Sequence, residues 1–258
     1  SHAGVELKYI MDFELKSNQY AERLRDVYKM GSEPTVDYRV NYPYSSPART
    51  NSLAKQLMLV ARLLSGGIKT KIFLCRIGGF DTHGEQVLVD DSSEGLHASL
   101  LYNMSTAVQD FYTDLRNQGL DHKVLAITFT EFGRRAKSNQ SYGTDHGTAT
   151  PVFVFGTRLN NGIYGENPGL AEEDLHNGNL VYNIDYRRIY TSIIQDWFEG
   201  DDEALIQTGF REWVDQKIDI VATGKTPVIE PGKNPDTVRI YPNPVSDLAH
   251  VEFTLARR

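Results

Sequence analysis

The chain has only one cysteine, no basic tract and no long apolar run. Each of these features excludes a type of bond, partner or structure. The single thiol, Cys75, can form no disulfide within the chain, and its place in an apolar run predicts an inert, buried side chain. There are 27 Lys and Arg residues against 34 Asp and Glu residues. This acidic balance argues against nucleic acid and anionic membranes as partners. No apolar stretch reaches the roughly eighteen residues of a membrane span.

Helical periodicity recurs along the chain. Apolar residues spaced three and four apart predict helices at residues 10–30, 53–64, 96–115 and 186–198. Asn51 or Ser52 is expected to cap the second of these helices, and Gly66 with Gly67 to end it. For the fourth helix, Asp185 is expected to serve as the N-terminal cap rather than as a catalytic residue.

Three apolar runs predict buried strands, at Lys71–Ile77, Lys123–Thr130 and Pro151–Phe155. The long predicted helix lies between the first two runs, and strand, helix, strand is the order of a parallel crossover. We therefore expect an α/β fold with an at least partly parallel sheet. The helix should pack on the face of this sheet, and the carboxyl ends of the first two strands should open on the same side.

The end of the chain has a different composition. Residues 223–236 are rich in Pro and Gly and lack helical periodicity, which indicates a linker. Residues 238–255 include an alternating pattern typical of a strand. The sequence thus predicts one α/β domain over residues 1–222, a linker over 223–236, and a short β-rich appendage over 237–258.

Four polar clusters lie at or near the ends of apolar runs: Gly78–His83, Glu131–Arg135, Gly143–Gly147 and Asp185–Arg188. In an open α/β sheet, ligand chemistry collects at the carboxyl ends of the strands, where loops bring distant residues together. Together the clusters supply carboxylates, imidazoles and guanidinium groups. This set of side chains suits a metal ion that holds an anionic group.

Asp81 and His83 lie two positions apart, so both side chains point to the same side if the strand end stays extended. Asp with His is a common ligand pair for Zn, Mn or a similar divalent ion. Gly78 and Gly79 remove side-chain bulk just before them and allow a close approach. The alternative is a turn with solvated polar residues, in which His83 caps a helix.

Glu131 directly follows a predicted strand, so its carboxylate should emerge at the same sheet edge. Arg134 and Arg135 follow shortly and can hold an anion bidentately. A surface salt bridge between Glu131 and one of these arginines is the alternative. His146 is expected to be a metal ligand, with Asp145 either on a second metal or as its orienting partner. An Asx turn between two strands would explain the same residues.

Three further histidines lack a partner cluster and are expected at the surface: His97, His122 and His176. The four clusters, in their order along the chain, carry a resemblance over about residues 51–197. Its motifs are Gly78–Gln86, Thr130–Arg135, Tyr142–Ala149 and Asp185–Arg187. In these motifs the chain closely resembles the bacterial family labelled domain of unknown function 1501.

That family looks like a branch of the alkaline phosphatase and sulfatase superfamily, whose members are metal-dependent enzymes that cleave phosphate or sulfate esters. The resemblance implies a three-layer α/β/α fold with a mostly parallel central sheet. It also implies a divalent ion, Zn, Mn or Ca, and ligand roles for Asp81, His83, Glu131 and His146. Together with Asp145, these residues form the expected metal set.

The chain departs from the superfamily pattern at Phe132, which stands where an imidazole ligand is usual, so a second metal position is weakened or hard-oxygen in character. The superfamily's nucleophile and first metal-binding Asp come from an early strand, and nothing comparable precedes Asn51. We therefore expect the chain to be the C-terminal part of a longer protein, with the nucleophile outside it.

The tail resembles a second known element. Residues 238–247 look like the opening of the C-terminal sorting domain that the type IX secretion system of Bacteroidetes-like bacteria recognises. An ordinary Pro-Asn-Pro turn between two strands is the alternative. The resemblance implies the secretion machinery as a partner and a secreted or cell-surface location.

Two classes of function follow. The first is a secreted metal-dependent hydrolase of a small-molecule or glycan-borne phosphate or sulfate ester. In it Glu131 completes the metal shell or orients a water, and Arg134 steadies the anion. The second is a non-catalytic cell-surface binding or assembly protein that keeps the fold and a structural metal.

Overall fold

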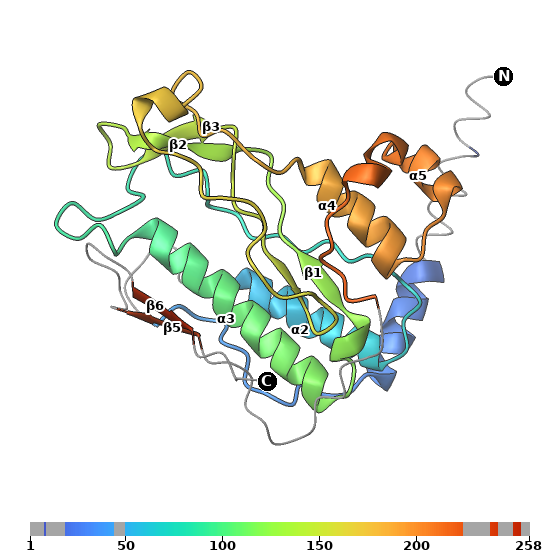
Figure 1. Cartoon of the computed structure of the whole chain (residues 1–258). Coiled ribbons are helices and arrows are strands. Elements are labelled where there is room, and N and C mark those ends of the chain that lie inside the picture. Colours follow the sequence, from blue (N-terminus) through green and yellow to red (C-terminus); the bar gives the residue numbers. More distant parts are fainter. Residues whose placement is uncertain (1–7, 9–18, 44–49, 224–237, 242–249, 254–258) are drawn as a thin grey trace. The chain divides into compact units, whose positions relative to one another are not determined.

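The structure is a computed structural model that describes residues 8, 19–43, 50–223, 238–241 and 250–253 (Figure 1). The chain divides into two compact units. The first comprises residues 1–79 and 99–121, and the second comprises residues 80–98 and 122–258. Within the described ranges, no helix has both the length and the apolar character needed to cross a membrane.

The first unit is helical. Its described elements are helical residues 19–30, helix α2 (Ser52–Ser65) and the part of helix α3 (Leu96–Asn117) that begins at Ser99. Asn51 caps α2, because its side-chain oxygen accepts a hydrogen bond from the Ala54 N–H at 3.2 Å. After Gly66, the chain leaves the helix through Gly67 at φ 82°, a conformation that glycine adopts without strain. The helices predicted over residues 53–64 and 96–115 are confirmed. Of the helix predicted over residues 10–30, residues 19–30 are helical and residues 10–18 lie outside the described part of the chain.

Buried carboxylates on α3 hold the loop over residues 32–43. Asp114, which is 1% exposed, accepts hydrogen bonds from the Thr35 N–H at 2.9 Å and the Tyr38 hydroxyl at 2.9 Å. One turn earlier, Asp110 accepts from the Arg39 N–H at 2.8 Å. Burial alone would raise the pKa of Asp114, but the hydrogen bonds from Thr35 and its other donors bring that pKa below its usual value.

This depressed pKa gives a testable prediction for Asp114→Asn. A group whose pKa is lower in the folded state stabilises the protein above its unfolded pKa, near 3.9, and this contribution is lost as the pH falls through the folded value. We expect the substitution to lower the free energy of unfolding by about 1–3 kcal/mol at pH 7 and by clearly less near pH 3. Urea unfolding at both pH values measures this difference.

The matched control is Asp37→Asn, which makes the same chemical change at an exposed position on the same loop. It should leave the unfolding free energy within about 0.5 kcal/mol of the wild-type value. An Asp114→Asn deficit of the same size at both pH values would contradict the role given to the ionised carboxylate.

The strand expected at Lys71–Ile77 is not formed, and this prediction is wrong. A strand needs a hydrogen-bonded neighbour, and no described segment pairs with these residues. Instead the side-chain amide of Gln56 bonds the Arg76 backbone twice, accepting from its N–H at 2.9 Å and donating to its C=O at 2.8 Å. Ile72 and Leu74 are left 74% and 76% exposed.

The described residues of the second unit form three small antiparallel sheets, two of them before the tail. Strand β1 (Leu125–Ile127) pairs with β4 (Val154–Gly156), and each lies within or overlaps a predicted strand. Strand β2 (Gly133–Ser138) pairs with β3 (Thr144–Gly147) in a hairpin that the sequence did not predict. Among the described residues all strand pairs are antiparallel, and the three-layer fold with a mostly parallel sheet stays a prediction.

Helix α4 (Tyr186–Ser192) covers the core of the second unit and runs on into a π-helical turn (Ile193–Trp197). As expected, Asp185 caps it, accepting from the Arg187 N–H at 2.9 Å. Buried apolar residues of the helix and of residues 218–221 meet side chains of β1 and β4. The buried members are Ile189, Ile193, Ile220 and Val221.

The remaining elements are short. They are helix α5 (Asp202–Thr208) and 3-10 turns at Asp121–Lys123, Glu172–Asp174 and Arg211–Gln216. In the tail, β5 (Val238–Tyr241) pairs antiparallel with β6 (His250–Phe253). Apart from Thr223, the predicted linker lies outside the described residues.

Candidate metal centre

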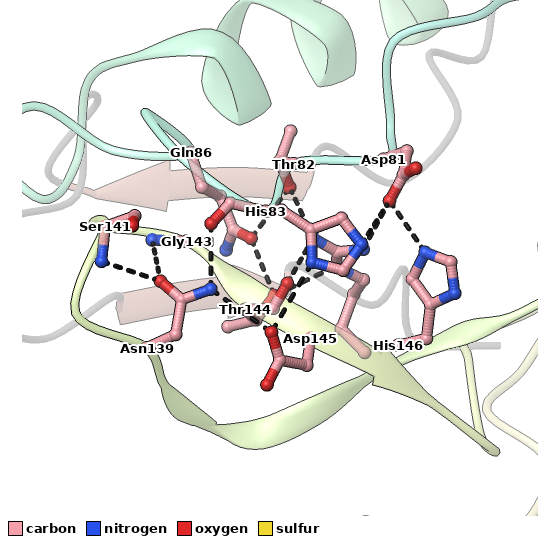
Figure 2. A network of polar contacts seen from close by, with 11 residues as sticks. Asp81, Thr82, His83, Gln86, Asn139, Ser141, Gly143, Thr144, Asp145 and His146 are labelled. Atoms are coloured by element: carbon pink, nitrogen blue, oxygen red, sulfur yellow. Dashed lines mark hydrogen bonds and ion pairs between the residues drawn. The ribbon is translucent and has the colours of Figure 1, made fainter.

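The candidate site is built on the β2–β3 hairpin of the second unit. Asn139 shapes its turn, since its side-chain oxygen accepts from the Ser141 N–H at 2.9 Å and the Gly143 N–H at 3.2 Å. Its own N–H donates to the Gly143 carbonyl at 2.8 Å. Asn is well suited to this position, because its short amide satisfies nearby backbone groups. Figure 2 shows this turn beside the predicted ligands.

The backbone at Thr82 and His83 lies directly against this hairpin. The Thr144 N–H donates to the Thr82 carbonyl at 3.2 Å, and the Asn139 amide donates to the His83 carbonyl at 2.8 Å. The approach is so close that a Cβ at Gly143 would lie 2.4 Å from the His83 backbone. Glycine is therefore required here for contact rather than for an unusual φ.

Three predicted ligands converge where these segments meet. The Asp81 Oδ1 atom lies 2.7 Å from His146 Nε2 and 3.1 Å from His83 Nε2. One ligand atom from each residue lies within 4.8 Å of the others. The three side chains are about half exposed, at 55%, 52% and 48% for Asp81, His83 and His146. Hydrogen bonds from His146 and then Arg134 hold the pKa of Asp81 below its usual value.

Asp145 does not join this group. Its Oδ1 atom lies 3.4 Å from His83 Nδ1 and accepts from the Asn139 amide at 3.3 Å. The Asn139 bond first, and then His83, lower the pKa of Asp145. A carboxylate on the outer nitrogen of a ligand histidine fixes its tautomer and ring orientation. Asp145 thus orients His83, whereas the sequence had suggested His146 or a second metal.

Arg134 is fixed by a polar network that the sequence did not reveal. Its Nε donates to the Thr144 hydroxyl at 2.9 Å and its Nη2 to the Thr82 hydroxyl at 3.2 Å. Both hydroxyls in turn donate to Gln86 Oε1 at 2.8 Å. The remaining guanidinium nitrogen, Nη1, lies 3.2 Å from Asp81 Oδ1. The arginine therefore helps to hold the carboxylate of the cluster in place.

Two rings contact the His146 imidazole. Phe132 stacks on it with ring centroids 3.8 Å apart and an angle of 12° between the planes. His83 lies 4.7 Å from it, centroid to centroid, at 37°. The Phe132 ring also lies 5.7 Å from the Arg134 guanidinium carbon. An aromatic side chain therefore contacts both the ligand histidine and the arginine beside it.

Glu131 is not part of the cluster of ligand atoms within the described residues. It is exposed, and its carboxylate accepts a long hydrogen bond of 3.5 Å from the Thr130 hydroxyl. His97 also differs from expectation, since it is half-buried and packs edge-on against Phe80. Burial first, and then the charge of Arg134, lower the pKa of His97.

Four residues that support the site were not predicted from the sequence: Thr82, Gln86, Asn139 and Thr144. One signal was available for two of them: Thr82 and Thr144 flank predicted site residues, and alternation along an extended chain sends their side chains to the opposite side. Gln86 and Asn139 carried no comparable signal, because the contacts that tie them to the site, with Thr144 and His83 respectively, join distant parts of the sequence.

The contact at Gly143 gives a second prediction. Gly143→Ala should force the hairpin away from His83, destabilise the protein by about 1–3 kcal/mol and separate the ligand groups. Gly162→Ala is the control, because a Cβ there meets nothing within 4 Å. Thermal unfolding of both variants measures the effect, and equal melting temperatures would show that the close approach is unimportant.

The fold and the site together define a protein with an Asp/His/His cluster where an antiparallel hairpin, which carries His146, meets the segment that carries Asp81 and His83. This set of groups could hold a divalent ion. The family model described as Protein of unknown function (DUF1501) matches residues 6–209. This match spans more than half of the chain, so the protein belongs to the DUF1501 family, as the sequence motifs indicated. Among curated proteins and solved structures, none matches the chain.

Proposed function

We propose that this protein is a secreted metal-dependent hydrolase of phosphate or sulfate esters. The observation that carries the proposal is the convergence of Asp81, His83 and His146, whose ligand atoms lie within 4.8 Å of one another. The fold brings His83 and His146, which are 63 positions apart in the sequence, to the same site. The substrate class is a small-molecule or glycan-borne anionic ester.

The donor set fits a divalent ion. One carboxylate oxygen and two imidazole nitrogens suit Zn or Mn better than Ca, which prefers oxygen ligands alone. Three protein ligands leave coordination positions for water and substrate, which is the pattern of catalytic rather than structural zinc. When bound there, the ion would polarise an ester oxygen and promote ionisation of a water.

The surrounding side chains have their own roles in the proposal. Asp145 at His83 Nδ1 leaves Nε2 as the ligand nitrogen. Arg134 places a positive charge beside the cluster, which favours an anionic ester group. Its main contacts, however, are with Thr82, Thr144 and Asp81, so it acts first by fixing the carboxylate. The exposed Glu131 is the candidate for orienting a water.

Resemblance supports the rest of the proposal. The motifs around the three ligands are similar to those of the alkaline phosphatase and sulfatase superfamily, which gives the reaction class. The tail over residues 238–247 resembles a type IX secretion sorting domain, which gives the secreted or cell-surface location and the export machinery as partner. Both resemblances go beyond membership of the DUF1501 family.

One observation favours a second candidate, a non-catalytic cell-surface binding or assembly protein with a structural ion. The two hydroxyls that contact Arg134 beside the cluster, those of Thr82 and Thr144, both donate to Gln86 Oε1. Neither hydroxyl therefore has an adjacent base to activate it as a nucleophile. In this reading the cluster binds its ion without turning over an ester.

Metal content and hydrolysis test the proposal together. The purified chain should bind about one equivalent of Zn²⁺ or Mn²⁺, and Asp81→Asn should weaken this binding by more than about a hundredfold, since a charged ligand is lost. Metal analysis after dialysis measures the binding, and release of nitrophenol from aryl phosphate and aryl sulfate measures the activity.

Asp90→Asn is the matched control, because Asp90 is exposed and lies outside the cluster. It should retain full metal content. The binding or assembly role would be favoured if a protein that includes any segment preceding this chain binds the metal but hydrolyses neither ester. Absence of bound metal in the wild-type protein would reject the site itself.

Export gives a further prediction. Deletion of residues 223–258 retains the buried Ile220 and Val221, so the melting temperature should change by less than a few degrees while export in the native host is abolished. Immunoblots of cells and medium measure export. A large loss of thermal stability would instead show that the tail strands complete the main domain, and the secretion assignment would lose its support.

A further inference from the structure

Phe132 occupies a defined position relative to the ligand histidine. It lies two residues before Arg134, so their side chains share one face of the extended chain. Arg134 pairs directly with His146 across the β2–β3 hairpin. Phe132 is therefore the diagonal neighbour of His146 on that face, where aromatic side chains are within reach of one another.

The contact between the two rings is nearly parallel. Their centroids lie 3.8 Å apart and their planes differ by 12°. A flat ring against the imidazole face opposes rotation of His146 about its ring-bearing bond. In the observed orientation His146 Nε2 lies 2.7 Å from Asp81 Oδ1, the carboxylate oxygen that His83 Nε2 also approaches, at 3.1 Å. Rotation would take this nitrogen away from that oxygen.

We infer that Phe132 is a positioning residue for the metal centre, holding the His146 imidazole in the orientation that presents Nε2 to the ion. This inference rests on the proposed metal site. The sequence pattern suggested that an imidazole ligand is lost at position 132. The inference gives the phenyl ring at this position the role of orienting a ligand. Phe132 acts through His146 and touches neither ion nor substrate.

The charge of a bound ion strengthens this role. An imidazole that binds a divalent cation carries more positive charge than a free one, and the face of an aromatic ring attracts positive charge. The Arg134 guanidinium carbon, 5.7 Å from the same ring centroid, adds a second cation near it. The ring therefore favours the metal-bound histidine over the free one, in addition to restricting its rotation.

Substitutions of Phe132 that keep a flat aromatic ring and those that keep only apolar bulk should differ in their effect on Zn²⁺ affinity. We expect Phe132→Leu, which keeps apolar bulk but loses the flat face, to weaken Zn²⁺ binding by about two- to tenfold. Phe132→Tyr keeps the flat face and should bind Zn²⁺ like the wild type. Phe132→Met is a second non-aromatic variant and should behave like Phe132→Leu.

The experiment is a Zn²⁺ titration of the full chain in competition with a chromophoric chelator, for the wild type and the three variants. The visible spectrum of the Co²⁺-loaded proteins reports ligand geometry, and it should change with Leu or Met but not with Tyr. Thermal unfolding of the metal-free proteins identifies variants that are folded, and only these enter the comparison.

Equal Zn²⁺ affinity and unchanged Co²⁺ spectra for the folded non-aromatic variants would overturn the inference. So would a loss in Phe132→Tyr equal to that in Phe132→Leu, because the flat face would then be irrelevant. If the wild-type protein binds neither ion, the metal site itself fails and this role fails with it. A wild type that binds while all variants bind equally rejects the role of Phe132 alone.

Discussion

The candidate site depends on the contact between the turn of the β2–β3 hairpin and the backbone of Thr82 and His83. One side of this contact carries Asp81 and His83, and the other carries Arg134 and His146. The ligands therefore meet only if the two backbones touch. Gly143 permits the touch, since any side chain there would collide with His83. Geometry that serves a cluster of charged groups is thus set by a residue without a side chain.

Around this contact, charge is arranged about a single oxygen. Asp81 Oδ1 faces two imidazoles and one guanidinium, while Asp145 sits behind His83. Such a concentration of donors on one carboxylate stabilises its ionised form, and the pKa of Asp81 is lowered accordingly. The side chains are half exposed, so solvent screens these interactions and each is weak in water. The support for a functional site is therefore the convergence of these side chains on one oxygen, not the strength of any single contact.

Local sequence signals predicted the helices well, because caps such as Asn51 and Asp185 act within a few residues of themselves. They also predicted Asp81, His83 and His146 as partners, since each lies in a compact polar motif. The strand at Lys71–Ile77 failed because strand formation depends on a neighbour that apolar content cannot specify. The roles of Gln86 and Asn139 were missed for a related reason, because their bonds to Thr144 and His83 join distant segments. The hairpin was missed because its strands are polar and lack the apolar pattern that predicts a strand.

The hydrogen bonds that fix Arg134 all run in one direction. The guanidinium donates to the hydroxyls of Thr82 and Thr144, and both hydroxyls donate to the Gln86 carbonyl oxygen. A guanidinium does not release its protons at any ordinary pH, and an amide oxygen passes none onward. This side of the cluster is therefore closed to proton transfer. Any proton that enters or leaves must travel through the exposed imidazoles or through solvent, on the side of the cluster away from this network.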